Sequence, residues 1–356
     1  MATRREAKAP WAPERDGPAH WLLGELAREA HKPERARLKV LAVVLAGGEG
    51  SRLHPLTDHV PKPALTLAKG LRIIDFVLAN LVNSGIISIY VLLQYKPQAI
   101  IAHLRRHWAP RTPDAGCFIT PVLPDAHDGS CFTGTANAVY QNLDLIERHR
   151  PDLVAVFAAD HVYRMDVRQM VSFHEQRDAE VTVAALPVPI QRASSFGVLA
   201  TGASGELTHF QEKPRNPMPL PADPTRAFAS MGNYLFNRGV LTQLLDQAQR
   251  RGDVDFGLHI LPRLPQTHRV FAYDFLTNCV PGIREYEEPG YWRDIGTLES
   301  FEATRQEVAG PFPRFDLANA QWPVRPEEDG ARLRDDVRPA ASGPLAGKAA
   351  VPTQIA

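Results

Sequence analysis

Long apolar runs and an excess of positive charge are both missing from this 356-residue sequence. Its longest aliphatic runs, such as Val40–Ala46, are far shorter than the ~20 residues needed to cross a bilayer, and its charged N-terminus lacks the apolar stretch of a signal peptide. Forty basic residues balance forty acidic residues, so no overall positive field attracts nucleic acid or an anionic membrane. We therefore expect neither partner, and any phosphate-binding charge must be local.

Cysteine is scarce as well. Cys117, Cys131 and Cys279 are an odd number without CxxC spacing, which argues against both a disulfide framework and a zinc site. No repeat of fixed period appears along the chain. A sequence with few cysteines and no disulfide framework is typical of the reducing cytoplasm, where we expect the protein to reside.

Hydrophobic residues make up 44% of the sequence, enough for a substantial core. Compact apolar runs typical of buried strands occur at Val40–Ala46, Ile86–Leu93, Leu153–Ala158 and Val181–Val188. Helical patterns alternate with these runs: a stripe from Ile73 to Val82 closed by Gly85, a stripe through Val139, Leu143 and Ile146, and a helix capped by Asp166. This alternation predicts an α/β fold with a doubly wound, mostly parallel sheet.

The second half of the sequence is more mixed. Phe196–Thr201 and Glu206–Glu212 flank a Gly202–Gly205 turn, which predicts a hairpin and an antiparallel extension of the sheet. Composition divides the chain into a charged arm at 1–38, a folded domain at 39–325 and a flexible, Pro/Ala-rich tail at 326–356. The arm contains one short amphipathic stretch, His20–His31.

Glycines follow the first predicted strand, in the run Gly47–Leu53. Glycines at the carboxyl end of a strand let backbone N–H groups approach a phosphate, and Arg52 supplies a positive charge, so a nucleoside triphosphate fits here. The run is neither a P-loop, since no Gly-Lys-Ser/Thr follows, nor the dinucleotide fingerprint. An ordinary tight turn stays open as the alternative, although the following Arg-Leu and the Pro61-Lys62-Pro63 element favour the phosphate site.

Two aspartates are candidate ligands for magnesium. Asp160 ends the strand Leu153–Ala158, at the edge where open α/β sheets bind ligands, and Asp294 lies in Tyr291–Thr297. Because Mg²⁺ is typically held by one or two carboxylates and substrate phosphates, the pair suits one metal ion. Spacing alone favours a helix cap or turn residue for each aspartate taken by itself, and their separation in sequence does not prove that they meet.

Glu212-Lys213 places an acid beside a base after a predicted strand, a pairing suited to a sugar hydroxyl and a phosphate. Gly197 and Ser230 offer a point of close backbone approach and a hydroxyl. The alternative for the pair is a solvated strand end. Asp255-Phe256-Gly257 spells a kinase triad, but the rest of a kinase signature is absent, so no magnesium is assigned to it.

Taken in order, these segments resemble the ADP-glucose pyrophosphorylases, and the actinobacterial branch most. The resemblance covers residues 39–325 and rests on these elements: Leu45–Leu53, Arg72–Phe76, Gln94–Tyr95, Ala159–Tyr163, Phe196–Val198, Glu212–Pro214, Ala229–Gly232 and Tyr291–Asp294. It implies the Rossmann-like fold of the nucleotide-diphospho-sugar transferases. It also implies transfer of the adenylyl group of ATP to glucose 1-phosphate, giving ADP-glucose for glycogen or related α-glucan synthesis.

The resemblance assigns roles to individual residues. Those implied to bind the nucleotide are Leu45, Ala46, Gly47, Gly48, Gly50, Gln94 and Gly134, with Arg52 and Lys62 as catalytic cations on its phosphates. Asp160 and Asp294 are implied to hold Mg²⁺. Those implied to bind glucose 1-phosphate are Phe132, Gly197, Glu212, Lys213 and Ser230.

The sequence departs from the family pattern at three places. Val60 replaces a basic residue, Ala68-Lys69 replaces a glycine pair, and the residues after Arg325 lack the hexapeptide period of the β-helix found in relatives. Two alternatives therefore stay open: a transferase using UTP, dTTP or GTP, and a non-catalytic paralogue that regulates a full-length relative. A homo-oligomer or a mixed oligomer with such a relative is compatible with either function.

Overall fold

The chain divides into two units, Met1–Leu38 and Lys39–Ala356. The computed structural model describes residues 38–324, apart from residue 69, residues 110–117 and residues 126–130. The predicted tail, the amphipathic stretch at 20–31 and Cys117 therefore lie outside the described residues, as does the predicted arm up to residue 37. The predicted domain boundaries stay predictions.

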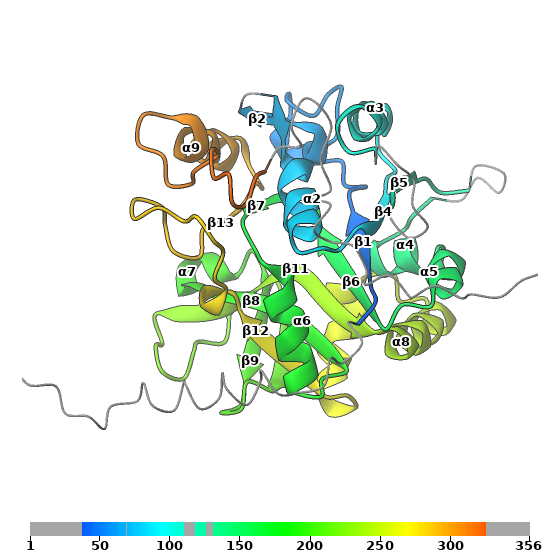
Figure 1. Cartoon of the computed structure of the whole chain (residues 1–356). Helices are drawn as coiled ribbons and strands as arrows, with labels where there is room; N and C mark the ends of the chain where they lie inside the picture. The colour runs from blue at the N-terminus through cyan, green and yellow to red at the C-terminus, as the bar shows by residue number, and fades with distance from the viewer. Residues whose placement is uncertain (1–37, 69, 110–117, 126–130, 325–356) are drawn as a thin grey trace, which may run out of the picture. The chain divides into compact units, whose positions relative to one another are not determined.

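A nine-stranded mixed sheet crosses the described part of the second unit. One half of this sheet is parallel and consists, in spatial order, of β5 (Phe118–Val122), β4 (Ser88–Leu92), β1 (Val40–Leu45) and β6 (Leu153–Ala158). Figure 1 shows β1 between β4 and β6. The predicted α/β fold with a parallel centre is confirmed.

The other half of the sheet begins where β11 (Arg226–Asn237) pairs antiparallel with β6. The hairpin of β9 (Gly197–Thr201) and β10 (Leu207–Glu212) continues it, and its turn contains Gly205 with φ +81°. β8 (Val181–Pro189) also pairs with β11, and β12 (Val270–Asp274) lies parallel to β8. Both the predicted hairpin and the antiparallel extension are confirmed.

Alternate residues of the central strands enter two separate cores, because successive side chains of a strand point to opposite faces. Ala42 and Val44 of β1 pack with α2 (Ile73–Asn83), α3 (Gln98–His107) and α6 (Val167–Gln176). Leu41 and Val43 pack with α4 (Thr135–Tyr140), α5 (Leu143–His149) and α8 (Arg238–Arg251). Helices thus cover both faces, which explains why β1 is apolar along its whole length.

The predicted helix boundaries are partly confirmed. Asp166 caps α6 by accepting a hydrogen bond from the Arg168 N–H at 3.0 Å, and α2 ends just before Gly85, as expected. The prediction of one helix through Val139, Leu143 and Ile146 was wrong. Asn142 adopts a non-helical conformation and divides this segment into α4 and α5. The Asn142 side chain donates to the Ala138 carbonyl at 2.8 Å, a local bond that competes with helix propagation.

The remaining strands form two short ladders. A two-stranded ladder pairs β7 (His161–Tyr163) with β13 (Trp292–Asp294), and another pairs β2 (Thr66–Ala68) with β3 (Leu71–Arg72). The helices α7 (Ile190–Ala193) and α9 (Leu298–Ala309) complete the set. Within the described ranges, none of the helices combines the length and the apolar character that crossing a membrane requires.

Candidate active site

The glycine run forms a tight loop between β1 and a 3₁₀ turn at Ser51–Leu53. Gly50 has φ +74°, and a Cβ added there would lie 2.8 Å from the Cβ of Lys62. The Thr57 hydroxyl donates to the Gly50 carbonyl at 3.0 Å and fixes the loop from inside. Both the backbone conformation and the closeness of Lys62 therefore require glycine at this position.

A cleft of about 530 Å³ opens beside this loop. It is lined by these residues among others: Leu45, Gly47, Gly48, Gly50, Arg52, Lys62, Gln94, Phe132, Gly134 and Asp160. Arg52 is exposed and forms no ion pair within the described part of the chain, so its charge is free for a ligand. Ala46 does not line the cleft, because it is 1% exposed and its N–H donates to the Leu92 carbonyl.

The opposite wall of the cleft is held by backbone contacts. Gln94 donates from Nε2 to the Phe132 carbonyl at 3.2 Å and accepts from the Phe132 N–H at Oε1. A Cβ on Gly134 would lie 2.3 Å from the Val254 carbonyl oxygen, which accepts two N–H groups from the start of α4. Gln94 and Gly134 therefore shape the wall as well as line it.

The two candidate aspartates lie close together, and of the two Asp160 lines the cleft whereas Asp294 does not. Asp160 follows β6, and antiparallel pairing of β13 with β7 places Asp294 opposite His161. Lys62 connects them: its Nζ lies 2.9 Å from Asp160 Oδ2 and 3.3 Å from Asp294 Oδ1. The ligand atoms of Asp160, His161 and Asp294 lie within 4.8 Å of one another. We call Asp160, Asp294, Lys62 and His161 the carboxylate centre.

Charge within the carboxylate centre favours the ionised form of Asp160. Burial raises the pKa of Asp160, but the charges of His161 and Lys62 and the hydrogen bond from Lys62 outweigh burial and hold that pKa well below its usual range. Asp160 Oδ1 and His161 Nδ1 are both buried and lack a hydrogen-bond partner. A buried carboxylate oxygen without a donor, beside a second carboxylate, is a donor set that fits a divalent cation.

Four of the five residues implied to bind glucose 1-phosphate lie on, or directly after, strands of the antiparallel half of the sheet, whereas the fifth, Phe132, lines the 530 Å³ cleft. Gly197 and Glu212 are opposite each other in the hairpin, and Lys213 Nζ lies 2.8 Å from Glu212 Oε1. Ser230 is on the neighbouring strand β11, where its Oγ accepts from the Gly232 N–H at 3.2 Å. None of these four residues lines the 530 Å³ cleft. Gly232 connects the two regions, because a Cβ there would lie 3.7 Å from His161 Cε1.

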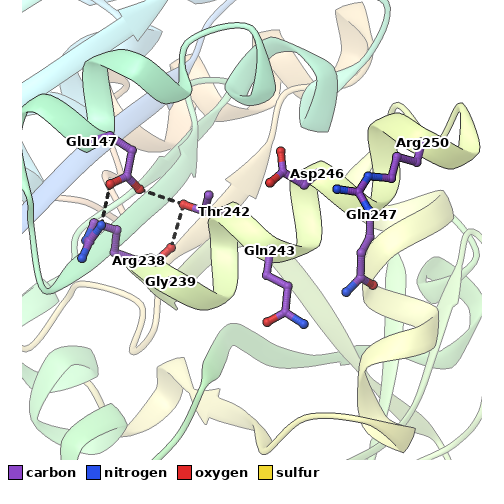
Figure 2. A pocket seen from close by; sticks show the side chains of 8 residues that line it. All are labelled: Glu147, Arg238, Gly239, Thr242, Gln243, Asp246, Gln247 and Arg250. Carbon is purple, nitrogen blue, oxygen red and sulfur yellow. Dashed lines mark hydrogen bonds and ion pairs between the residues drawn. The ribbon is translucent and has the colours of Figure 1, made fainter.

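A second hollow, of about 490 Å³, lies between α5 and α8 and shares no residue with the cleft. Figure 2 shows its polar lining, in which Glu147 accepts hydrogen bonds from Arg238 and from Thr242, the latter at 2.9 Å. The polar groups of Glu147, Arg238 and Thr242 thus bond to one another. We do not assign this hollow a part in the site.

Comparison with known proteins decides the family. The model of a family described as nucleotidyl transferase matches residues 41–310. The chain belongs to this family. It is 48% identical to the glucose-1-phosphate adenylyltransferase of Thermodesulfovibrio yellowstonii over 290 residues, which are 81% of this chain and 71% of that protein. It is 44% identical to the enzyme of the same name from Thermus thermophilus over 299 residues, with the same coverage of both chains.

Sequence reasoning missed one member of the carboxylate centre in this nucleotidyl transferase. His161 was quoted only as part of a motif, and pairing of β7 with β13 is the long-range contact that brings it to Asp294. Its ring centroid lies 5.0 Å from that of Trp292. The adjacent Arg293 forms ion pairs with Glu307 and Glu288. The Tyr-Trp-Arg-Asp motif therefore holds β13 in place and also supplies Asp294.

The Arg72–Phe76 motif has a structural role. Asp75 is buried, and its carboxylate accepts from His103 at 2.6 Å, from Trp108 at 2.8 Å and from the Arg72 N–H at 2.7 Å. These bonds fix the start of α2 against α3 and cap the helix. Asp255, excluded from metal binding by the sequence analysis, lines the cleft and accepts from Thr135 Oγ1 at 2.9 Å.

Proposed function

We propose that this protein transfers the adenylyl group of ATP to glucose 1-phosphate, giving ADP-glucose and pyrophosphate. The observation that carries this proposal is a glycine-lined cleft that contains Asp160 and Lys62, whose ammonium also bonds to the neighbouring Asp294. Relatives named glucose-1-phosphate adenylyltransferase, 44% and 48% identical to this chain, support the choice of substrates.

The reaction is an in-line displacement at phosphorus. A phosphate oxygen of glucose 1-phosphate forms a bond to the α-phosphorus of ATP, and the bond from that phosphorus to the oxygen bridging the β-phosphate breaks. The electron pair leaves with pyrophosphate. Because the attacking oxygen is already anionic, the reaction needs no general base, and catalysis rests on positioning and on neutralising crowded oxygens.

We assign three cations of this chain to that neutralisation, of which Lys62 and Lys213 already form ion pairs with carboxylates of this chain. Arg52 is exposed at the cleft and lacks an ion pair within the described residues, so we assign it to the phosphates of ATP. Lys62 lines the same cleft, and Lys213 lies beside Glu212, where we place the sugar phosphate. Loss of one such cation is expected to raise the barrier by about 3 kcal/mol, roughly a hundredfold in rate.

We assign Mg²⁺ to Asp160 and Asp294. The buried, unpartnered Oδ1 of Asp160 and the second carboxylate beside it support this assignment. When bound, the ion supplies positive charge to the phosphate oxygens and orients them. Lys62 has a complementary part, since its ammonium balances the charge of both carboxylates and holds them at the cleft.

We place the protein in the cytoplasm. Cys131 and Cys279 are both free and exposed, a state that a reducing compartment preserves. Cell fractionation with immunodetection tests this placement, and recovery of the protein outside the cytosolic fraction would contradict it.

Assembly into a homo-oligomer, or into a mixed oligomer with a longer relative, is part of the same proposal. Exposed apolar side chains support it: Phe312 is 87% exposed, and Leu56 and Leu298 line a hollow beside α9. Light scattering of the purified chain, alone and with a longer relative, measures the assembly. A monomer under both conditions would contradict it.

The decisive experiment measures pyrophosphate release from ATP, Mg²⁺ and glucose 1-phosphate, with the sugar nucleotide identified by mass. ADP-glucose is the expected product. The same assay with UTP, dTTP and GTP tests the alternative nucleotides, since faster turnover with any of them would replace ATP in the proposal. Absence of release with all four nucleotides would favour a non-catalytic regulatory protein.

A further inference from the structure

His161 lies between the two carboxylates of the carboxylate centre. Its Nδ1 is 3.4 Å from Asp160 Oδ1, and its Nε2 is 3.6 Å from Asp294 Oδ1. One imidazole ring therefore faces both aspartates, one with each nitrogen. Asp160 lies in the bend between β6 and β7 and Asp294 lies in β13, and the two repel each other when ionised, so their separation needs groups that hold both.

The ring of His161 is held in place on several sides. Its side chain is 10% exposed, and the indole ring of Trp292 lies against it with 5.0 Å between the ring centroids. Gly232 of β11 lies near the ring, since a Cβ built on it would make ordinary van der Waals contact with His161 Cε1 at 3.7 Å. Pairing of β7 with β13 fixes the backbone of His161 opposite Asp294.

Lys62 donates hydrogen bonds to both carboxylates, whereas His161 lies at ion-pair distance from both, and its Nδ1 makes no hydrogen bond. Lys62 lines the cleft, whereas His161 does not. Each nitrogen of His161 faces a carboxylate oxygen, which leaves neither nitrogen directed at the cleft where substrate phosphates fit. This arrangement favours a role in supporting the aspartates over direct contact with substrate.

The geometry points to His161 as the positioning residue that sets the separation of Asp160 and Asp294, and thereby their affinity for a divalent cation. This inference rests on the proposed function in one respect, namely that the cation bound here is the one used in adenylyl transfer. Removing a group that orients a metal ligand typically lowers the metal affinity by about 10–100-fold. His161→Ala is therefore expected to weaken cation binding by about tenfold or more.

The test measures cation binding to the purified protein without substrates. Mn²⁺ binding is followed by electron paramagnetic resonance, and Mg²⁺ binding by competition against Mn²⁺, for the wild type and for His161→Ala, His161→Asn and His161→Gln. The Asn amide reaches the place of Nδ1 and contacts Asp160, whereas the Gln amide reaches the place of Nε2 and contacts Asp294. Each amide is expected to restore part of the affinity that alanine loses, for both cations alike.

A matched control separates positioning from general loss of stability. His174 is a buried histidine in α6 that bonds to Thr182 and Asn237, remote from the carboxylate centre in its contacts. His174→Ala is expected to lower the melting temperature while leaving Mn²⁺ affinity unchanged. If His161→Ala fails to fold, the Asn and Gln variants, which keep a polar group of similar size, carry the test.

Two results would overturn the inference. Wild-type affinity for both cations in all His161 variants would show that the ring does not set the separation of the aspartates. A loss confined to Mn²⁺, with Mg²⁺ affinity intact, would make His161 a direct nitrogen ligand instead. Failure of the wild type to make ADP-glucose would count against the proposed function alone, because cation binding is measured without substrates.

Discussion

The nucleotide cleft and the carboxylate centre are built in opposite ways. The cleft is formed largely at the ends of neighbouring parallel strands, where a glycine loop and backbone hydrogen bonds shape its walls. The carboxylate centre is assembled from β6, the ladder of β7 with β13, and a lysine from a separate turn. Backbone constraints determine the first region, and paired charges determine the second.

The largest expected effect follows from removing a charge in the carboxylate centre. Asp160→Asn and Asp294→Asn are each expected to reduce kcat nearly to background, because each removes one of the two carboxylates assigned to the cation. Melting temperature and circular dichroism check that the fold is retained. Unchanged activity in either purified variant would remove that aspartate from the site and weaken the contrast between the two regions.

A smaller effect is expected from Lys213→Ala. Its ammonium is placed on the phosphate of the sugar, so KM for glucose 1-phosphate should rise by up to about a hundredfold while KM for ATP changes little. Initial rates with each substrate varied in turn measure both constants. Equal increases in the two KM values would show that Lys213 also acts on the nucleotide. The residues assigned to the sugar phosphate would then not be separate from the nucleotide cleft.

Two glycine substitutions test whether backbone constraints determine the cleft. Gly50→Ala places a Cβ at positive φ and 2.8 Å from Lys62, and should cost about 1–3 kcal/mol of unfolding free energy. Gly48→Ala is the matched control, since an added Cβ there has no neighbour within 4 Å. It should leave stability unchanged and raise KM for ATP, because Gly48 lines the cleft. Equal stability of both variants in urea would contradict this expectation.

The contrast also explains what the sequence could predict. Local patterns predicted the strand Leu153–Ala158 with its observed bounds, the cap at Asp166 and the glycine loop, because each depends on neighbours in sequence. The break at Asn142 was missed, since an apolar stripe continues across it while a single side-chain bond interrupts the helix.

Contacts between distant residues could not be predicted from local patterns. Lys62 is an isolated lysine in sequence, yet its side chain is only 9% exposed and its ammonium pairs with two aspartates that are distant from it in sequence. His161 reaches Asp294 only through pairing of two three-residue strands, too short to give a periodic signal. The assignments of the site residues to substrates stay predictions until they are measured.

The smallest expected effect concerns pH and lies outside both regions, in the contact of α6 with β8 and β11. Burial lowers the pKa of His174 below its usual value of about 6.5, against the opposing effects of its bond to Asn237 and of Asp178. As the pH falls, the unfolded chain therefore takes up this proton before the folded chain does. The stability that the neutral ring contributes is fully present above the unfolded pKa and decreases as the pH falls through it.

His174→Gln removes this titration while keeping a polar side chain. The urea midpoint of the wild type should thus fall more between pH 7.5 and pH 5.5 than the midpoint of the variant. The difference between the two proteins isolates His174 from the other histidines, and equal falls would show that its environment does not disfavour the charged ring. If kcat of the wild type and of the variant changes in parallel over the same range, protonation of His174 affects stability without affecting turnover at the carboxylate centre.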